Sequence, residues 1–272
     1  MAHPELEELP PVGLGTWQND DYQECVRTVR QALEIGYRHV DTAQLYENED
    51  AVGQGFEESS VDREDIFLAT KLHFDHMSPN EVRETTLRSL EDLRTKYVDL
   101  LYVHWPAGNY EADRTLPAME ELVDEDRIRY IGLSNFTPDL LERARGVLEQ
   151  PVYAHQVEMH PFLQQNHLLR EARDYGIRLV AYSPFRHGTI FDEPVLQKIA
   201  EQNDCTVAQV CLAWLKHKDG VYPIPKATGR DHLEDNFRAC DVALDEEDQS
   251  TIDDIDTVDR YIDPPFAPDW EL

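Results

Sequence analysis

The sequence has few cysteines and no long apolar run, and each shortage excludes a class of protein. Only 4 of the 272 residues are cysteine, and no C-x-x-C pair occurs, so neither a disulfide framework nor a thiolate metal site is predicted. No stretch of 18 apolar residues is present, and the initial MAHPELEELPP lacks a basic segment followed by an apolar one. We therefore expect no membrane span and no secretion, and reduced cysteines in a cytoplasmic protein.

Positive charge is also scarce. The chain has 55 Asp and Glu against 25 Lys and Arg, a formal net charge of −30, and only 6 of the 25 are lysine. A chain this negative is expected to bind neither nucleic acid nor anionic membranes. The acid is spread along the whole chain, and such a surface repels itself unless salt screens it. We interpret it as a halophile's surface, an ordinary acidic cytosolic protein being the alternative.

A complete glycine-rich dinucleotide motif is missing too. Gly13-x-Gly15 and Gly53-x-Gly55 both lack the third glycine, and neither joins a strand to a helix, which argues against a Rossmann fold. After the turn-rich ELPPVGLGTW, strands are predicted at 37–41, 66–72, 98–104, 129–134, 153–159, 178–183, 221–225 and near 239–242. Helices are predicted at 20–35, 47–58, 78–95, 115–126, after Thr137-Pro138, and at 164–175, 193–203 and 206–218. Eight strands alternating with helices predict one α/β domain over residues 1–272, a (β/α)8 TIM barrel.

Four chemically matched residues follow successive predicted strands. GYRHVDTAQLY supplies Asp41 and Tyr46, IFLATKL supplies Lys71, and VDLLYVHW supplies His104. In a parallel barrel these strand ends meet at one face. A free phenol is a weak acid at neutral pH, with a pKa of about 10, so a proton-donating Tyr46 needs a cation such as Lys71 beside it.

Asp41 is the counter-ion that a buried Lys71 requires, and His104 would orient a carbonyl oxygen. Each residue taken singly has an ordinary structural explanation, as a buried aromatic, a turn residue, a solvated charge or a core imidazole. Together they predict carbonyl reduction.

Several motifs occur in the order and at the approximate spacing of a known family. They are GLGTWQ, VDTAQLYENEDAVG, LATKL, HWP, IGLSNF, HQVEMHPF, AYSPF and IPKATGRDHLEDNF. On these motifs the chain resembles the aldo-keto reductases over nearly its full length. The resemblance implies a (β/α)8 barrel that binds a nicotinamide nucleotide across its C-terminal face. It also implies a small-molecule carbonyl substrate, since the smaller prokaryotic members reduce aldehydes, α-dicarbonyls and keto-sugars.

The resemblance also assigns the predicted cofactor residues. Ser134, Asn135 and Gln156 would bind the nicotinamide carboxamide, and Tyr182 would stack on the ring. The other predicted cofactor residues lie near the nicotinamide end or the adenosine half of the nucleotide: Thr16, Ser183, Lys226, Arg230, His232, Asp235 and Asn236.

The chain departs from the family where a 2′-phosphate would bind. Relatives carry Lys-Ser and an Arg six residues after the Lys, whereas this chain has Lys226-Ala227 and His232. Arg230 stands two residues away and would compensate. We expect NADP as cofactor, and NAD remains an alternative.

The predicted substrate pocket is aromatic, although these residues could also be packing. It comprises Trp17, His73, Phe74, Trp105 and Phe185. The tail from Asp263 is short, and which carbonyl compound enters the pocket is left open.

We expect the protein to be a monomer.

Two other classes of protein remain open. A metallohydrolase on the same barrel would use His104, His155 and His160, although these lack an H-x-H or H-E-x-x-H spacing. A non-catalytic nucleotide-sensing subunit would keep the fold without needing Tyr46, Lys71 and His104.

Overall fold

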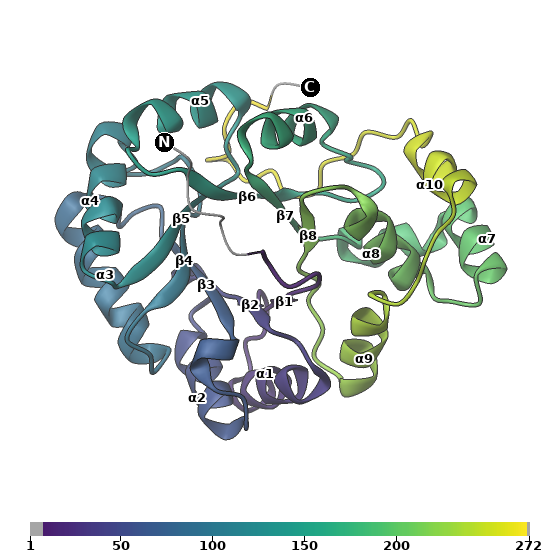
Figure 1. The fold of residues 1–272 in the computed structure, drawn as a ribbon, viewed down its shortest axis with the longest axis horizontal. Helices are drawn as coiled ribbons and strands as arrows, with labels where there is room; N and C mark the ends of the chain where they lie inside the picture. The colour runs from purple at the N-terminus through teal and green to yellow at the C-terminus, as the bar shows by residue number, and fades with distance from the viewer. Residues whose placement is uncertain (1–7, 271–272) are drawn as a thin grey trace.

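Eight parallel strands form the centre of the structure, a computed structural model that describes residues 8–270 (Figure 1). They pair in the order in which they occur in the chain: β1 (Leu14–Gly15), β2 (His39–Asp41), β3 (Phe67–Leu72), β4 (Val98–Val103), β5 (Ile128–Ser134), β6 (Val152–Glu158), β7 (Arg178–Tyr182) and β8 (Val221–Pro223). The ring closes where Gly13 N donates to Pro223 O (2.9 Å) and Gly15 N donates to Pro225 O (3.1 Å). The predicted (β/α)8 barrel is confirmed.

Helices surround the strands (Figure 1). They are α1 (Tyr22–Ile35), α2 (Glu49–Glu58), α3 (Pro79–Asp92), α4 (Ala112–Asp124), α5 (Pro138–Val147), α6 (Asn166–Tyr175), α7 (Pro194–Gln202), α8 (Val207–His217), α9 (Arg230–Arg238) and α10 (Glu246–Asp253), with short 3-10 helices η1 (Gln44–Tyr46), η2 (Arg63–Asp65) and η3 (Arg186–Asp192). None of the helices within residues 8–270 is long and apolar enough to cross a membrane.

The local sequence explains these elements. Every residue of β3, β4 and β6 is buried, as expected of strands covered on both faces. Helix α3 starts at a capping box in which Ser78 and Glu81 bond reciprocally, with Pro79 in the first turn, and both features favour a helix start.

The eighth strand is not where the sequence pattern predicts it. The strand predicted near 239–242 is wrong: this segment is a turn that follows α9, where Ala239 N and Cys240 N donate to Asn236 O and Phe237 O. The missing strand is β1, inside the turn-rich ELPPVGLGTW. Two residues are too few to show a strand period. Helices α9 and α10 were also not predicted.

Candidate active site

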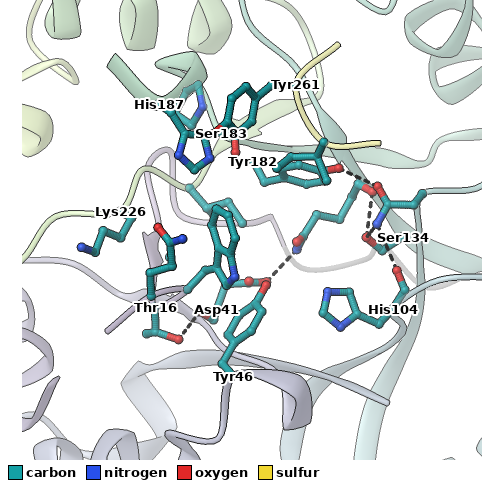
Figure 2. Close-up of a pocket in the computed structure, with 18 of the residues that line it drawn as sticks. Thr16, Asp41, Tyr46, His104, Ser134, Tyr182, Ser183, His187, Lys226 and Tyr261 are labelled. Carbon is teal, nitrogen blue, oxygen red and sulfur yellow. Dashed lines mark hydrogen bonds between the residues drawn. The ribbon is translucent and has the colours of Figure 1, made fainter. Parts of the chain in front are cut away.

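A cavity of about 660 Å³ opens at the carboxyl ends of the strands (Figure 2). Its wall is made by residues that follow most of the strands and by the segment from Tyr261 to Phe266. Asp41, Tyr46 and His104 line it. His104 therefore meets two side chains from far earlier in the chain where the barrel positions chemistry.

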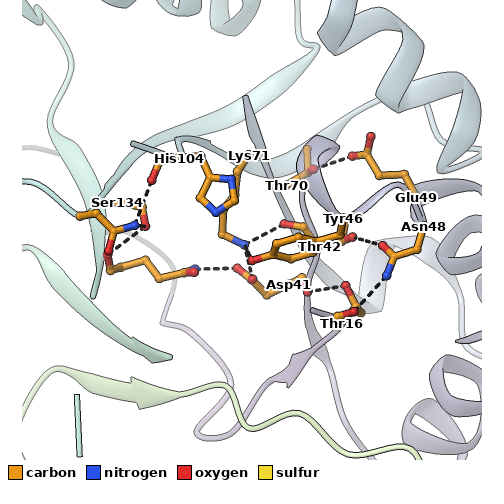
Figure 3. Close-up of polar contacts among 12 residues, drawn as sticks. Thr16, Asp41, Thr42, Tyr46, Asn48, Glu49, Thr70, Lys71, His104 and Ser134 are labelled. Atoms are coloured by element: carbon orange, nitrogen blue, oxygen red, sulfur yellow. Dashed lines mark hydrogen bonds and ion pairs between the residues drawn. The ribbon is translucent and has the colours of Figure 1, made fainter. Parts of the chain in front are cut away.

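Lys71 connects Asp41 to Tyr46 (Figure 3). Its Nζ donates to Asp41 Oδ1, to the carbonyl oxygen of Thr42 (2.8 Å) and to the hydroxyl of Tyr46 (3.3 Å). Lys71 is fully buried and Asp41 almost so, and a buried ammonium is stable only when it is paired and hydrogen-bonded in this way. The Tyr46 hydroxyl thus has a cation within reach.

Burial and charge set the protonation states. Burial, together with the charge of Asp41, raises the pKa of Tyr46 well above its usual value, so the phenol is protonated at neutral pH. Burial raises the pKa of Asp41 and lowers that of Lys71, and in each case the partner's charge opposes the shift. With its oxygens held by Lys71 and by Gln156 Nε2 (2.7 Å), Asp41 has the contacts of an ionised carboxylate.

His104 lies beside Tyr46. The two rings are 5.6 Å apart and nearly perpendicular, at 81°. Burial and the Lys71 charge lower the pKa of His104 well below its usual value, so the imidazole is neutral. A neutral ring next to the phenol can donate one hydrogen bond and accept another.

A chain of hydrogen bonds connects further polar residues of the cavity to His104. Tyr182 Oη donates to Asn135 Oδ1 (2.7 Å), and Asn135 Nδ2 donates to the carbonyl oxygen of His104 (3.0 Å). Ser134 Oγ donates to the carbonyl oxygen of Gln156 (3.0 Å). Ser134, Asn135, Gln156 and Tyr182 all line the cavity and form one polar wall linked to Asp41.

The other predicted cofactor residues divide into two groups. Thr16, Ser183 and Lys226 line the cavity. The rest lie on α9, outside the lining: Arg230, His232, Asp235 and Asn236.

The contacts on α9 show what those residues do within the described chain. Arg230 pairs with Glu34 (3.5 Å) and Glu234 (2.8 Å), and Asp235 accepts from Thr206 Oγ1 (2.9 Å). Asn236 is buried and His232 is exposed. Contact between these four residues and an extended nucleotide stays a prediction.

The predicted aromatic pocket is also divided. Trp17, Trp105 and Phe185 line the cavity, whereas His73 and Phe74 do not. The Phe74 ring packs instead on Phe266, 4.5 Å away, and Phe266 does line it.

The C-terminal segment supplies residues that strand-end reasoning missed. Glu158 accepts hydrogen bonds from Tyr261 N and Ile262 N (both 2.8 Å), and the Tyr261 ring stacks on His187 at 4.2 Å. Further lining residues outside the prediction include Leu45, Phe191 and Phe266. Aromatic residues near the chain's end were the only available signal, because coil segments have no periodicity that places them.

The three histidines of the metallohydrolase alternative do not converge. His155 Nε2 accepts from Phe136 N (3.2 Å), and His160 contacts Glu158 (2.9 Å). Burial lowers the pKa of His155 to about 3, so this ring is neutral. Within residues 8–270 no group of three or more His, Cys, Asp or Glu side chains is arranged to hold a metal ion.

Comparison with known proteins identifies the family. Residues 11–257 match the family model described as "Aldo/keto reductase family". The chain is 37% identical over 267 residues to methylglyoxal reductase DkgB of Escherichia coli O157:H7, covering 97% of this chain and 99% of that protein. The chain belongs to the aldo/keto reductase family, and its activity is the reduction of a carbonyl with a nicotinamide nucleotide.

Two solved structures support this. A putative 2,5-diketo-D-gluconic acid reductase B has a TM-score of 0.93 at 34% identity, covering 97% of this chain and 94% of that one. An aldo-keto reductase of Bombyx mori in complex with NADP has a TM-score of 0.88 at 30% identity, covering 94% and 92%.

Proposed function

We propose that this protein reduces small aldehydes and α-dicarbonyls to alcohols with NADPH, and that Tyr46 donates the proton. The observation that carries the proposal is the contact between Lys71 Nζ and the Tyr46 hydroxyl (3.3 Å) at the wall of the cavity. A protonated phenol beside a buried cation is a donor whose conjugate base is stabilised as the proton leaves.

The residues of the cavity fit a nicotinamide nucleotide. Its polar wall offers the hydroxyl and amide groups of Ser134, Asn135 and Gln156, the groups that a planar carboxamide needs. Lys226 lines the cavity too and forms no ion pair among residues 8–270, so its charge is available for a phosphate. When bound, the nucleotide supplies the hydride.

The four catalytic residues are Asp41, Tyr46, Lys71 and His104, and each has a separate task. Neutral His104 donates a hydrogen bond that orients the carbonyl oxygen towards Tyr46, which lowers the barrier by positioning. Tyr46 then transfers its hydroxyl proton to that oxygen. Lys71 stabilises the phenolate, and Asp41 keeps Lys71 charged.

The choice of NADP over NAD as the cofactor rests on the NADP complex of the Bombyx mori relative and on Lys226. The charge of Arg230 is already shared with Glu34 and Glu234, and the side chain of Ala227 has no hydrogen-bond donor for a 2′-phosphate. We therefore propose a preference for NADPH carried mainly by Lys226. One such charge-assisted hydrogen bond is worth about tenfold in affinity, and kcat/KM measured with both nucleotides tests this.

The substrate proposal rests on the methylglyoxal reductase relative and on the shape of the site. The rim carries Trp17, Leu45 and Phe266, which are each more than a third exposed. An apolar rim over a polar floor suits a short carbonyl compound whose reactive oxygen reaches the floor while its carbon end contacts the rim.

Replacement of the proton donor tests the proposal. Tyr46→Phe should lower kcat for methylglyoxal by a factor of about 10² to 10⁴, while NADPH still binds. The measurement is NADPH oxidation by absorbance, with NADPH affinity from fluorescence. Tyr110→Phe removes a hydroxyl outside the cavity and should match the parent; near-parental turnover in Tyr46→Phe would refute the assignment.

A further inference from the structure

A second cavity, of about 410 Å³, lies outside the barrel between η1, α2 and α3. Glu49, the first residue of α2, lines it and is only 7% exposed. Its Oε1 accepts from Thr70 Oγ1 (2.5 Å) and its Oε2 accepts from Ser89 Oγ (2.8 Å). Buried carboxylates need such partners, and the partners here come from two other elements, β3 and α3.

Thr70 connects Glu49 to the reaction site. Neighbouring residues of a strand point to opposite faces, so Thr70 faces the helices and Lys71 faces the barrel interior (Figure 3). Glu49 therefore holds the outer face of β3 directly behind Lys71.

Gln44 connects the same cluster to Tyr46. Both residues belong to the single turn of η1. Gln44 Nε2 donates to Ser89 Oγ (3.2 Å), and Gln44 Oε1 accepts from His73 N (2.8 Å), two residues beyond Lys71. The turn that carries Tyr46 and the strand that carries Lys71 are thus fastened to one polar cluster, defined by Gln44, Glu49, Thr70 and Ser89.

We propose that Glu49 is a positioning residue of this reductase, whose carboxylate sets the relative placement of Lys71 and Tyr46 and supports the charge on Lys71. The inference rests on the proposed function, because it assigns Lys71 and Tyr46 their tasks. A carboxylate accepts both hydroxyl hydrogen bonds at once. A protonated carboxyl has one donor in place of an acceptor, so one hydroxyl would have to turn round.

The charge state of Glu49 changes near neutrality. Burial raises its pKa to about 7, and its negative charge opposes the lowering of the Lys71 pKa. The charged or titratable groups that face it are Glu47, Asp50, Lys71, His76, Arg88 and Asp92. Glu49 is a carboxylate above its pKa, so kcat should be full there and fall as the pH drops through about 7.

Glu49→Gln tests the charge. The amide keeps the shape but cannot accept both hydroxyl hydrogen bonds, and displacement of reacting groups costs up to about a hundredfold in rate. We expect kcat with methylglyoxal and NADPH to fall about tenfold or more, the fall of kcat below neutrality to disappear, and the dissociation constant of NADPH to change less than about twofold, well under the tenfold of one lost charged contact.

Thr70→Val gives a second, milder test. Valine fills the volume of threonine without its hydroxyl, and the Thr70 hydrogen bond lowers the Glu49 pKa. Its loss should therefore move the inflection of the kcat profile to higher pH, a shift that a purely structural role would not produce. This test stands even if Glu49→Gln does not fold.

Two control variants test whether Glu49, and not another side chain, is responsible for these effects. Thr86→Val removes a buried hydroxyl of α3 that donates to Val82 O (2.7 Å), away from Glu49, and should leave rate and pH profile as in the parent. His76→Asn should keep the inflection. Three results would overturn the inference while the proposed function stands: loss of the inflection in His76→Asn, an unchanged pH of the inflection in Thr70→Val, or the parental kcat in Glu49→Gln. A parent protein without turnover would overturn both.

Discussion

Replacement of Lys71 tests two roles of this residue, one in the reaction and one in the stability of the fold. Its ammonium is fully buried against Asp41 and beside Tyr46. Without this cation the Tyr46 phenolate loses its stabilising charge, so the phenol becomes a weaker acid. We expect Lys71→Met to lose most activity and its residual rate to have an optimum at lower pH, where external protons replace the donor.

Asp41 provides the matched control for this variant. Lys71→Met leaves the Asp41 carboxylate buried without its cation, which should destabilise the fold by about 3–5 kcal/mol. Asp41→Asn added to Lys71→Met should recover much of that loss without restoring activity. The measurements are kcat against pH and urea unfolding; an unchanged profile and rate in Lys71→Met would show that Lys71 is structural only.

At the scale of elements, the contact between α2 and the end of α3 depends on Gly53. A Cβ at this position would lie 2.3 Å from the carbonyl oxygen of Asp92 and 2.9 Å from the Cα of Leu93. Backbone atoms cannot move aside as a flexible side chain can, so alanine would push the helices apart. Helix α2 also carries Glu49, and this displacement would reach the cluster behind Lys71.

Gly53→Ala should therefore lower the free energy of unfolding by about 1–3 kcal/mol, the range for overpacked cores. Gly146→Ala is the matched control, because it lies within α5 with nothing within 4 Å of its added Cβ. That change should stabilise the protein by about 0.5–1 kcal/mol, since alanine is the better helix former. Urea denaturation of both variants measures the difference, and equal stabilities would contradict the close-contact argument.

At the scale of the whole molecule, the net charge of −30 dominates the surface. Many ion pairs at the surface are exposed arginine–carboxylate contacts such as Arg88–Glu84 and Arg114–Glu111, each of which contributes little to stability. With 55 acidic and 25 basic residues, most carboxylates have no cation to pair with. Repulsion among them should weaken the compact state at low salt.

Salt should therefore raise the melting temperature and the activity. The screening length is about 10 Å at 0.1 M and about 3 Å at 1 M, so the repulsion should largely vanish on the way to about 2 M KCl. Melting curves and rates across this range measure the effect. NaCl serves as the control, because screening depends on ionic strength and not on the cation; an equal melting temperature at both ends of the range would contradict the halophile interpretation.

The sequence alone determined which face of the fold carries Asp41, Lys71 and His104. Each follows a buried run, and the ends of parallel strands in a barrel meet at one face whatever the loops do. The polar residues after later strands, such as Ser134 and Gln156, follow from the same rule. This part of the site was predictable because strand period and strand direction are local properties of the chain.

Only the tertiary structure decided the rest. β1 is too short to show a period and exists because Gly15 pairs with Asp41 of β2 and with Lys226 just beyond β8. Tyr261 reaches the cavity because Glu158, over 100 positions earlier, binds its backbone. Arg230 pairs with Glu34 on another helix, and Glu49 lies behind Lys71 because its carboxylate binds Thr70 of β3 and Ser89 of α3. These are contacts between segments far apart in the chain, which no local pattern encodes.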